Sequence, residues 1–159
     1  MAAKKKGKAP PGATLLVKNR RATHNYEILD TFEAGLVLQG SEVKSIRDGK
    51  ISLAESYAQF KGTELWLLGA HVAEYPMAHM RNHDPLRPRK LLLHRRELDR
   101  LQESVTQGGL TVVPLSMYLK DGRIKLEIGL ARGKKAVDKR NAIKERDTKR
   151  ELDRAMRER

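Results

Sequence analysis

Alternating apolar and polar residues predict short β-strands along most of the chain. The first strand-like run, YEILDTFEAGLVL, begins at Tyr26 and is rich in β-branched and aromatic residues. The runs SYAQFK and ELWLLGAHVA are separated by Gly62-Thr63 and predict a hairpin with Trp66 in or near the core. The runs LTVVPLSMYLK and RIKLEIGLA are joined by Asp121-Gly122, the strongest short hairpin signal in the sequence.

Two segments have the periodicity of short helices. Residues 41–47, SEVKSIR, predict a helix that stops at Asp48-Gly49. Residues 94–107 predict a longer helix ended by Gly108-Gly109, because apolar side chains recur at spacings of three and four, at Leu98, Leu101 and Val105. Residues 76–90 contain three of the six prolines and predict a long exposed loop.

These elements predict a mainly β fold. Roughly six short strands with two small helices are typical of a closed or nearly closed β-barrel of the OB type, a fold that commonly binds oligonucleotides. A length of 159 residues suits one domain with appendages. We expect a disordered basic arm over residues 1–18, an RNA-binding barrel over 19–135 and a basic C-terminal tail over 136–159.

The distribution of charge indicates a polyanionic partner. The net charge is +13, and residues 1–21 contain seven Lys or Arg and no acid, whereas residues 132–159 contain twelve against six acids. The segment between them holds fourteen of each sign, so the excess sits in the two ends. Flexible cationic ends neutralise phosphate and release counterions. An acidic membrane is the competing partner, but neither end offers an apolar face with Trp or Phe.

The tail has helix-supporting charge pairs without an apolar stripe. Glu145/Lys149 and Asp153/Arg157 are acid-first pairs four residues apart, each worth about 0.2–0.5 kcal/mol. Its apolar residues are too few to form a continuous stripe, namely Ile143, Leu152 and Met156. We therefore expect a tail that is mostly disordered when free and helical when docked in an anionic groove.

Composition and motifs argue against enzyme chemistry. The chain has no cysteine, which excludes disulfides and thiolate sites and favours a reducing cytosol. It contains no P-loop, dinucleotide fingerprint, G-x-S-x-G or HExxH motif, and its N-terminus lacks a secretory apolar region. His79 and His83 lie in a Pro-flanked loop and are a weak metal candidate. We expect no catalytic residue, metal or cofactor, and a cytoplasmic monomer.

Three basic clusters at the edges of predicted elements favour a nucleic-acid surface. The first lies before the first strand and contains Lys18, Asn19, Arg20, Arg21 and His24. The second precedes an apolar run and contains Arg87, Arg89 and Lys90. The third surrounds Gly133, whose missing side chain lets backbone approach phosphate, and contains Arg132, Lys134 and Lys135. Since aromatic residues make up only 4% of the chain, recognition of folded RNA by shape is favoured over base stacking.

Several long blocks together resemble one family. The blocks NRRATHNYEILDTFEAGLVLQGSEVKSIRDGKISL, RPRKLLLHRREL and GRIKLEIGLARGKKAVDKRNAIKERD are closely similar to the SmpB family, over about residues 19–147. The resemblance implies an OB-type barrel that binds the tRNA-like domain of transfer-messenger RNA. It also implies a non-enzymatic adaptor that carries this RNA to ribosomes stalled without a stop codon, the process called trans-translation.

The resemblance also implies roles for individual residues. The RNA-binding face would include Asn19, Arg20, His24, Gln39, Glu42, Lys44, Ser45, Arg47 and the stretch Arg132 to Lys135. Glu42 would face the RNA and accept hydrogen bonds from base amino groups or a 2′-hydroxyl. The tail would enter the decoding centre of the small subunit and the empty messenger channel as a helix, through Asp138, Lys139, Arg140, Ile143, Lys144, Arg146 and Met156. Val137 departs from the family, which often has His or Tyr there to stack on a ribosomal base.

The residues are also compatible with two other functions. One is a general RNA-binding module or RNA chaperone that acts through its basic ends. The other is a protein–protein scaffold in which the tail is a partner helix. The first predicts a loss of RNA preference at high salt, and the second predicts that ribosomes leave the tail unprotected.

Overall fold

The computed structural model describes residues 9–134 and 136–157, with the side chains of His79, residues 136–145 and Arg157 excepted. Residues 1–8 of the predicted arm therefore lie outside the described residues, as does Lys135.

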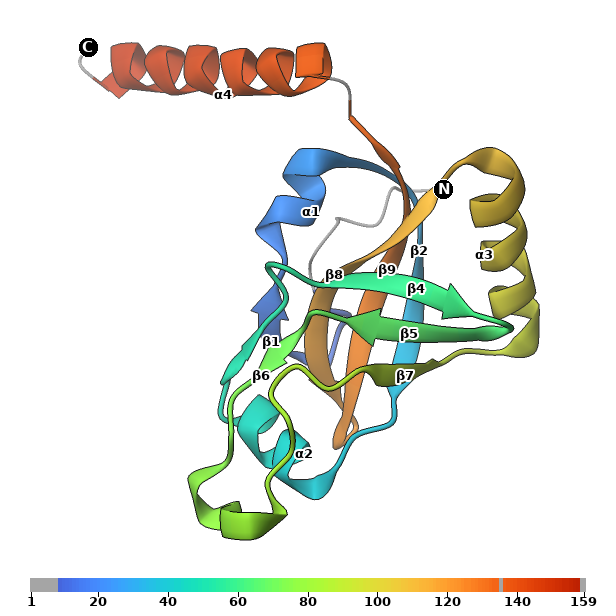
Figure 1. Cartoon of the computed structure of the whole chain (residues 1–159). Helices are drawn as coiled ribbons and strands as arrows, with labels where there is room; N and C mark the ends of the chain where they lie inside the picture. The colour runs from blue at the N-terminus through green and yellow to red at the C-terminus, as the bar shows by residue number, and fades with distance from the viewer. Residues whose placement is uncertain (1–8, 135, 158–159) are drawn as a thin grey trace.

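Six strands form a closed ring of hydrogen-bonded neighbours (Figure 1). The order is β8-β4-β5-β7-β2-β9, and a pairing of β9 with β8 closes it. The strands are β2 (Tyr26–Leu36), β4 (Tyr57–Lys61), β5 (Glu64–Leu68), β7 (Arg89–Leu92), β8 (Thr111–Lys120) and β9 (Arg123–Gly133). Two very short strands, β3 (Ile51–Ser52) and β6 (His71–Val72), pair separately. The mainly β prediction is confirmed.

Local turn chemistry sets the two hairpins that the sequence predicted. Lys120 pairs with Arg123, and the turn between them has positive φ at Asp121 (51°) and Gly122 (75°). This combination matches the right-handed twist of the flanking strands. In the other hairpin, Lys61 pairs with Glu64 across the predicted turn. Both hairpin predictions are confirmed.

The inside of the ring is an apolar core. Leu65 and Leu67 of β5, Leu91 of β7 and Leu126 of β9 are all at most 1% exposed. A smaller cluster lies at the α1 end of the ring and consists of Ala22, Ile28, Val113, Leu115 and Ala131. Trp66 is not part of either buried cluster: it lies between two inward residues of β5, half-buried, with the Lys61 ammonium 5.5 Å from its ring centroid. Alternation of side chains along a strand explains this outward position.

Three helices surround the ring, and the tail helix projects away from it (Figure 1). The two predicted helices are confirmed as α2 (Gly40–Arg47) and α3 (Arg95–Gly108), and Gly109 ends α3 with a φ of 62°. Two more are present, α1 (Arg20–Asn25) and the tail helix α4 (Ala136–Arg157). The loop prediction for residues 76–90 is only partly right, because Pro76–Arg81 form a 3-10 helix, η1, and Arg89 begins β7 as a buried residue.

The prediction of a disordered arm ending at residue 18 is wrong at its C-terminal end. Thr14–Lys18 form strand β1, which pairs antiparallel with β8 between Ser116 and Leu119. The half-buried side chains of Leu16 and Val17 pack against the core. The cost of ordering this basic segment is therefore offset by apolar burial and by ladder hydrogen bonds.

We expect Gly69→Ala to destabilise the fold, because two independent constraints apply at this position. Gly69 has a φ of +73°, and a Cβ there would lie 2.5 Å from the Glu55 carbonyl oxygen. Forcing the backbone apart costs about 1–3 kcal/mol in addition to the left-handed conformation. The matched control is Gly62→Ala, with a φ of +62° and nothing within 4 Å of the added Cβ. Urea unfolding of both variants measures the difference, and equal losses of stability would contradict the clash.

Candidate nucleic-acid interface

The first and third basic clusters of the sequence meet at one end of the ring. The Lys134 amide donates to the Asn25 carbonyl over 3.0 Å, and the Lys134 ammonium donates to the Thr23 carbonyl over 3.1 Å. These bonds join the end of β9 to helix α1, more than a hundred residues earlier. We call the resulting cationic region the α1 surface; it consists of Arg20, Arg21, His24, Arg132 and Lys134.

Most side chains of the α1 surface are available to a partner. Arg20 and Arg21 are exposed on α1, and Arg132 is exposed with only a surface ion pair to Glu27 at 3.1 Å. Such exposed pairs are worth at most about 1 kcal/mol and yield readily to a phosphate. A Cβ at Gly133 would meet nothing within 4 Å, so packing within the protein does not require glycine there.

The tail helix α4 leaves the ring at the α1 surface (Figure 1). Arg146 donates to the His24 Nδ1 atom over 3.2 Å, which makes this ring nitrogen an acceptor. A hollow of about 340 Å³ lies here, lined by His24, Arg146, Asp147 and Arg150. Side chains 146–156 are all exposed, including Met156. The side chains of Val137, Asp138, Lys139, Arg140, Ile143 and Lys144 lie outside the described residues.

Two further predicted cations, Lys44 and Arg47, lie on α2 beyond the opposite end of β2. Helix α2 follows this strand, whereas α1 precedes it (Figure 1). Eleven residues at about 3.3 Å each separate the two ends by up to roughly 35 Å. Among the predicted contacts in this region, three are exposed and are called the α2 surface: Gln39, Lys44 and Arg47. Arg47 donates to the Gly122 carbonyl over 3.1 Å, and the Lys44 ammonium lies 5.4 Å from the centroid of the Tyr75 ring.

The interpretation of Glu42 as a residue that faces RNA is wrong, because this side chain is completely buried. Its carboxylate accepts hydrogen bonds from Arg87 and Arg89 and, over 2.8 Å, from the Gln39 amide. Burial alone would raise the pKa of the Glu42 carboxyl, but these hydrogen bonds outweigh it and lower the pKa. The buried charge holds α2 against the segment that leads into β7.

Three further predicted RNA contacts are also buried. Arg89 is 1% exposed, and besides Glu42 it donates to the Ala70 carbonyl over 2.8 Å. Ser45 is fully buried and donates to the Ala73 carbonyl over 2.5 Å. Asn19 is 5% exposed and donates to the Pro114 carbonyl over 2.9 Å. These buried side chains position the backbone around the two surfaces.

The second basic cluster is largely occupied by contacts within the protein. Arg87 is partly buried and donates to the Val37 carbonyl over 3.2 Å in addition to Glu42. Lys90 lies opposite Trp66 in the pairing of β7 with β5 and forms an ion pair with Glu64 at 3.1 Å. Of this cluster, Lys90 is the most exposed, with 38% of its side chain accessible against 27% for Arg87 and 1% for Arg89.

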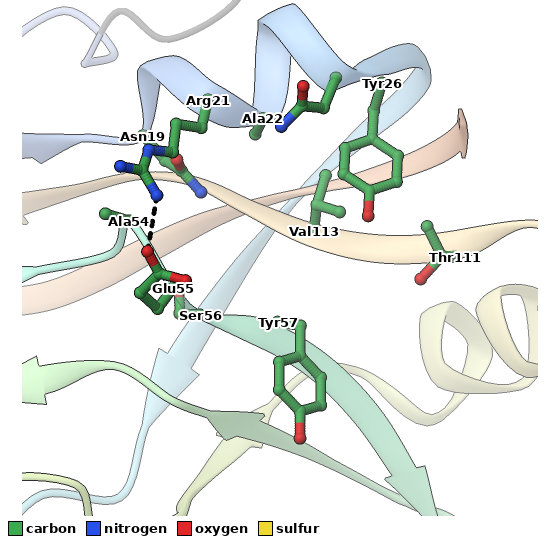
Figure 2. Close-up of a pocket in the computed structure, with 11 residues that line it drawn as sticks. Asn19, Arg21, Ala22, Tyr26, Ala54, Glu55, Ser56, Tyr57, Thr111 and Val113 are labelled. Carbon is green, nitrogen blue, oxygen red and sulfur yellow. Dashed lines mark hydrogen bonds and ion pairs between the residues drawn. The ribbon is translucent and has the colours of Figure 1, made fainter. Parts of the chain in front are cut away.

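Sequence reasoning missed a hollow of about 350 Å³ beside the α1 surface, shown in Figure 2. It lies between α1, the residues before and at the start of β4, and β8. Tyr26 and Tyr57 both line it, together with an ion pair of Arg21 and Glu55 at 2.6 Å. An exposed tyrosine in an alternating strand has no local signal that marks it as part of a site.

The described residues contain no group of three or more His, Asp or Glu suited to a metal ion. His83, one of the two weak candidates, is buried, with its ring nitrogens 2.8 Å from the Ser41 hydroxyl and 2.9 Å from the Val72 carbonyl. Because the carbonyl only accepts, the Nε2 atom carries a proton. Among the residues that the structure describes, no helix combines the length and apolarity that crossing a bilayer requires.

Comparisons with known proteins agree on one family. The model of the SmpB protein family matches residues 16–158. The chain is 53% identical over 159 residues to an SsrA-binding protein of Thermobifida fusca (strain YX), covering 100% of this chain and 99% of the relative. It is 54% identical over 144 residues to that of Limosilactobacillus fermentum, covering 91% and 92%.

A solved structure is similar as well. It is described as "tmRNA-SmpB: a journey to the center of the bacterial ribosome" and is 52% identical to this chain. The match has a TM-score of 0.63 and covers 76% of this chain and 85% of the other.

Proposed function

The chain belongs to the SmpB family, and on this premise we propose that it is an adaptor that binds the tRNA-like domain of transfer-messenger RNA and delivers it to stalled ribosomes. The chain is identical to SsrA-binding proteins at about half of its positions, over nearly its whole length. This similarity supports the RNA partner. A related protein in a structure of transfer-messenger RNA and the bacterial ribosome supports the ribosomal partner. The adaptor role requires no catalysis and gives the protein a cytoplasmic site of action.

The observation that carries this function is the meeting of distant basic blocks at the α1 surface. Hydrogen bonds from Lys134 hold β9 against α1 and so fix the spacing of their cations. Fixed cations read the shape of a folded RNA, whereas cations on flexible segments only add affinity. We therefore assign the tRNA-like domain to the α1 surface.

The α2 surface is proposed as a second contact with the same RNA. Its exposed cations, Lys44 and Arg47, lie at the far end of β2, up to roughly 35 Å away. A folded RNA can touch both ends of the ring, whereas a short oligonucleotide bound at one end cannot. This arrangement favours a large folded partner.

We further propose that the six-stranded ring is an OB-type barrel and that residues 136–159 contact the ribosome. Helix α4 would enter the decoding centre and the messenger channel, with Arg146 and the cations before it facing ribosomal RNA. Val137 would form no stacking contact, because its side chain has no ring. The tail would become ordered when it docks on the ribosome.

We expect the preference for the tRNA-like domain over an unrelated RNA duplex of equal length to persist as salt rises. Phosphate contacts weaken with salt for both RNAs, whereas shape-dependent contacts survive for the specific one. Titration of the full chain against both RNAs from low to high salt measures the ratio of the two dissociation constants. A ratio that falls toward one would support a general RNA-binding module instead.

A further inference from the structure

The loop between β6 and β7 exposes apolar side chains on its short 3-10 helix, η1. Met77 and Met80 of η1 are 74% and 100% exposed, whereas Met117 of β8 is fully buried in the core. In a 3-10 helix, side chains three residues apart lie directly above one another. The two methionines therefore form one apolar ridge along η1, which we call the methionine ridge.

The loop that carries the methionine ridge is held in place at both ends of η1. The Asn82 side chain accepts from the Tyr75 amide over 3.0 Å and donates to the Tyr75 carbonyl over 2.8 Å. His83, the next residue, is buried and hydrogen-bonded at both ring nitrogens. Residues 70–107 contain no glycine. A loop fixed in this way loses little conformational entropy when a partner binds the side chains that it presents.

The same loop is slightly acidic in a strongly basic chain. Residues 74–86 contain two carboxylates, Glu74 and Asp84, and one guanidinium, Arg81, and all three side chains are exposed. The whole chain has a net charge of +13. Because like charges repel, this stretch disfavours a phosphate backbone and favours a partner with cations around an apolar groove.

The position of the loop separates it from the tail. Figure 1 shows η1, in lime green, beside α2, at the end of the ring opposite to α1 and α4. A chain that holds RNA at the α1 surface and contacts the ribosome through its tail therefore still presents the methionine ridge to a third component of the assembly.

From these observations we propose that the methionine ridge inserts into an apolar groove on a basic protein of the ribosome, with Glu74 and Asp84 facing cations at the rim of that groove. Methionine suits such a contact, because its flexible and polarisable side chain adapts to irregular apolar surfaces. Proteins that neutralise ribosomal RNA are basic, which matches the acidic character of the loop. This inference rests on the proposed function, since it names a component of the same ribosomal partner.

The first test removes the apolar ridge in the full chain. The double variant Met77→Gln with Met80→Gln keeps the length of both side chains and makes their ends polar. When loaded with transfer-messenger RNA, it should bind purified stalled ribosomes on the order of tenfold more weakly, the effect of losing one buried apolar side chain. Its affinity for the isolated tRNA-like domain should be unchanged.

The matched control is Leu29→Gln, because Leu29 is also an exposed apolar side chain, 45% accessible, but lies on β2 outside the loop. This variant should bind ribosomes as the unmodified chain does. Co-sedimentation with ribosomes measures the dissociation constants, and thermal unfolding followed by circular dichroism verifies that each variant is folded.

The second test identifies the partner. A photoreactive benzoylphenylalanine replaces Met80, and the full chain is irradiated on purified stalled ribosomes together with transfer-messenger RNA. Mass spectrometry should find position 80 joined to a ribosomal protein that the same group at position 29 does not reach.

Two results would overturn the proposal and leave RNA binding intact. One is a crosslink from position 80 only to RNA or to a second copy of the chain. The other is equal affinity of the double variant and the unmodified chain for ribosomes. Failure of the unmodified chain to prefer the tRNA-like domain would instead count against the proposed function.

Discussion

Glu42→Ala is expected to lower the free energy of unfolding by about 3–5 kcal/mol, the usual cost of removing one partner from a buried ion pair. Arg89 is 1% exposed and would keep its charge beside an empty position, with only carbonyl acceptors left from Ala70 and Pro85. Arg87 would lose its only carboxylate among the described contacts. Urea unfolding at neutral pH measures the loss.

The matched control is Glu64→Ala. Glu64 forms an ion pair with Lys90 at 3.1 Å, but both side chains are exposed, so the loss should be below about 1 kcal/mol. Any loss of RNA affinity in Glu42→Ala should follow the fraction of unfolded protein. A variant that is fully stable and still binds RNA poorly would restore the interpretation that Glu42 contacts the RNA.

The Glu42 carboxylate also makes part of the free energy of unfolding depend on pH. Because the folded state lowers the pKa of Glu42, its contribution is complete above the pKa of an unfolded glutamate, about 4.3. The contribution is lost as pH falls through the lower pKa of the folded state. In Glu42→Gln this part of the acid dependence should be absent, and urea midpoints measured below pH 5 compare the two chains.

Removal of residues 136–159 is expected to abolish tagging on stalled ribosomes while RNA binding is largely retained. Side chains 146–156 of α4 are exposed, and Arg146 donates one hydrogen bond to His24 of α1. The α1 surface therefore remains assembled without the tail. Tagging is measured by translation of a message that lacks a stop codon, and RNA affinity by titration at moderate salt, where nonspecific attraction is screened.

The matched control for the truncation is Arg154→Ala, because Arg154 is exposed on α4 and lies beyond the cations that are proposed to face ribosomal RNA. This variant should retain RNA binding and most of the tagging activity. A truncated chain that loses RNA affinity and tagging to the same degree would show that the tail and the ring do not act separately.

Elements stabilised by local interactions could be predicted from the sequence. The hairpin at Asp121-Gly122 and helix α3 with its Gly109 end depend on neighbouring residues, and both were predicted. Helix α1 was missed because its six residues contain one apolar side chain, Ala22. Strand β1 was missed because its partner, β8, lies about a hundred residues away and the cations around it suggested disorder.

The candidate interface, too, has features that could be predicted from the sequence and features that could not. Sequence reasoning named the basic blocks, but only the three-dimensional structure separates exposed Arg20 and Arg47 from buried Arg89. Burial of a charged residue depends on a partner supplied from elsewhere in the chain, here Glu42, and the spacing of the two in the sequence carries no such signal. Tyr57 was missed for the same reason, since its pocket is assembled from three separate segments.

Closure of the ring has a consequence for newly made copies of this protein. Strand β9 pairs with both β2 and β8, and its contacts with β2 join residues about a hundred positions apart. Until β9 has been synthesised, β2 and β8 each have an unpaired edge with free amide and carbonyl groups. Such edges template pairing with other chains. Chains whose synthesis stops before Arg123 are therefore expected to aggregate. The protein itself must accordingly be synthesised to completion.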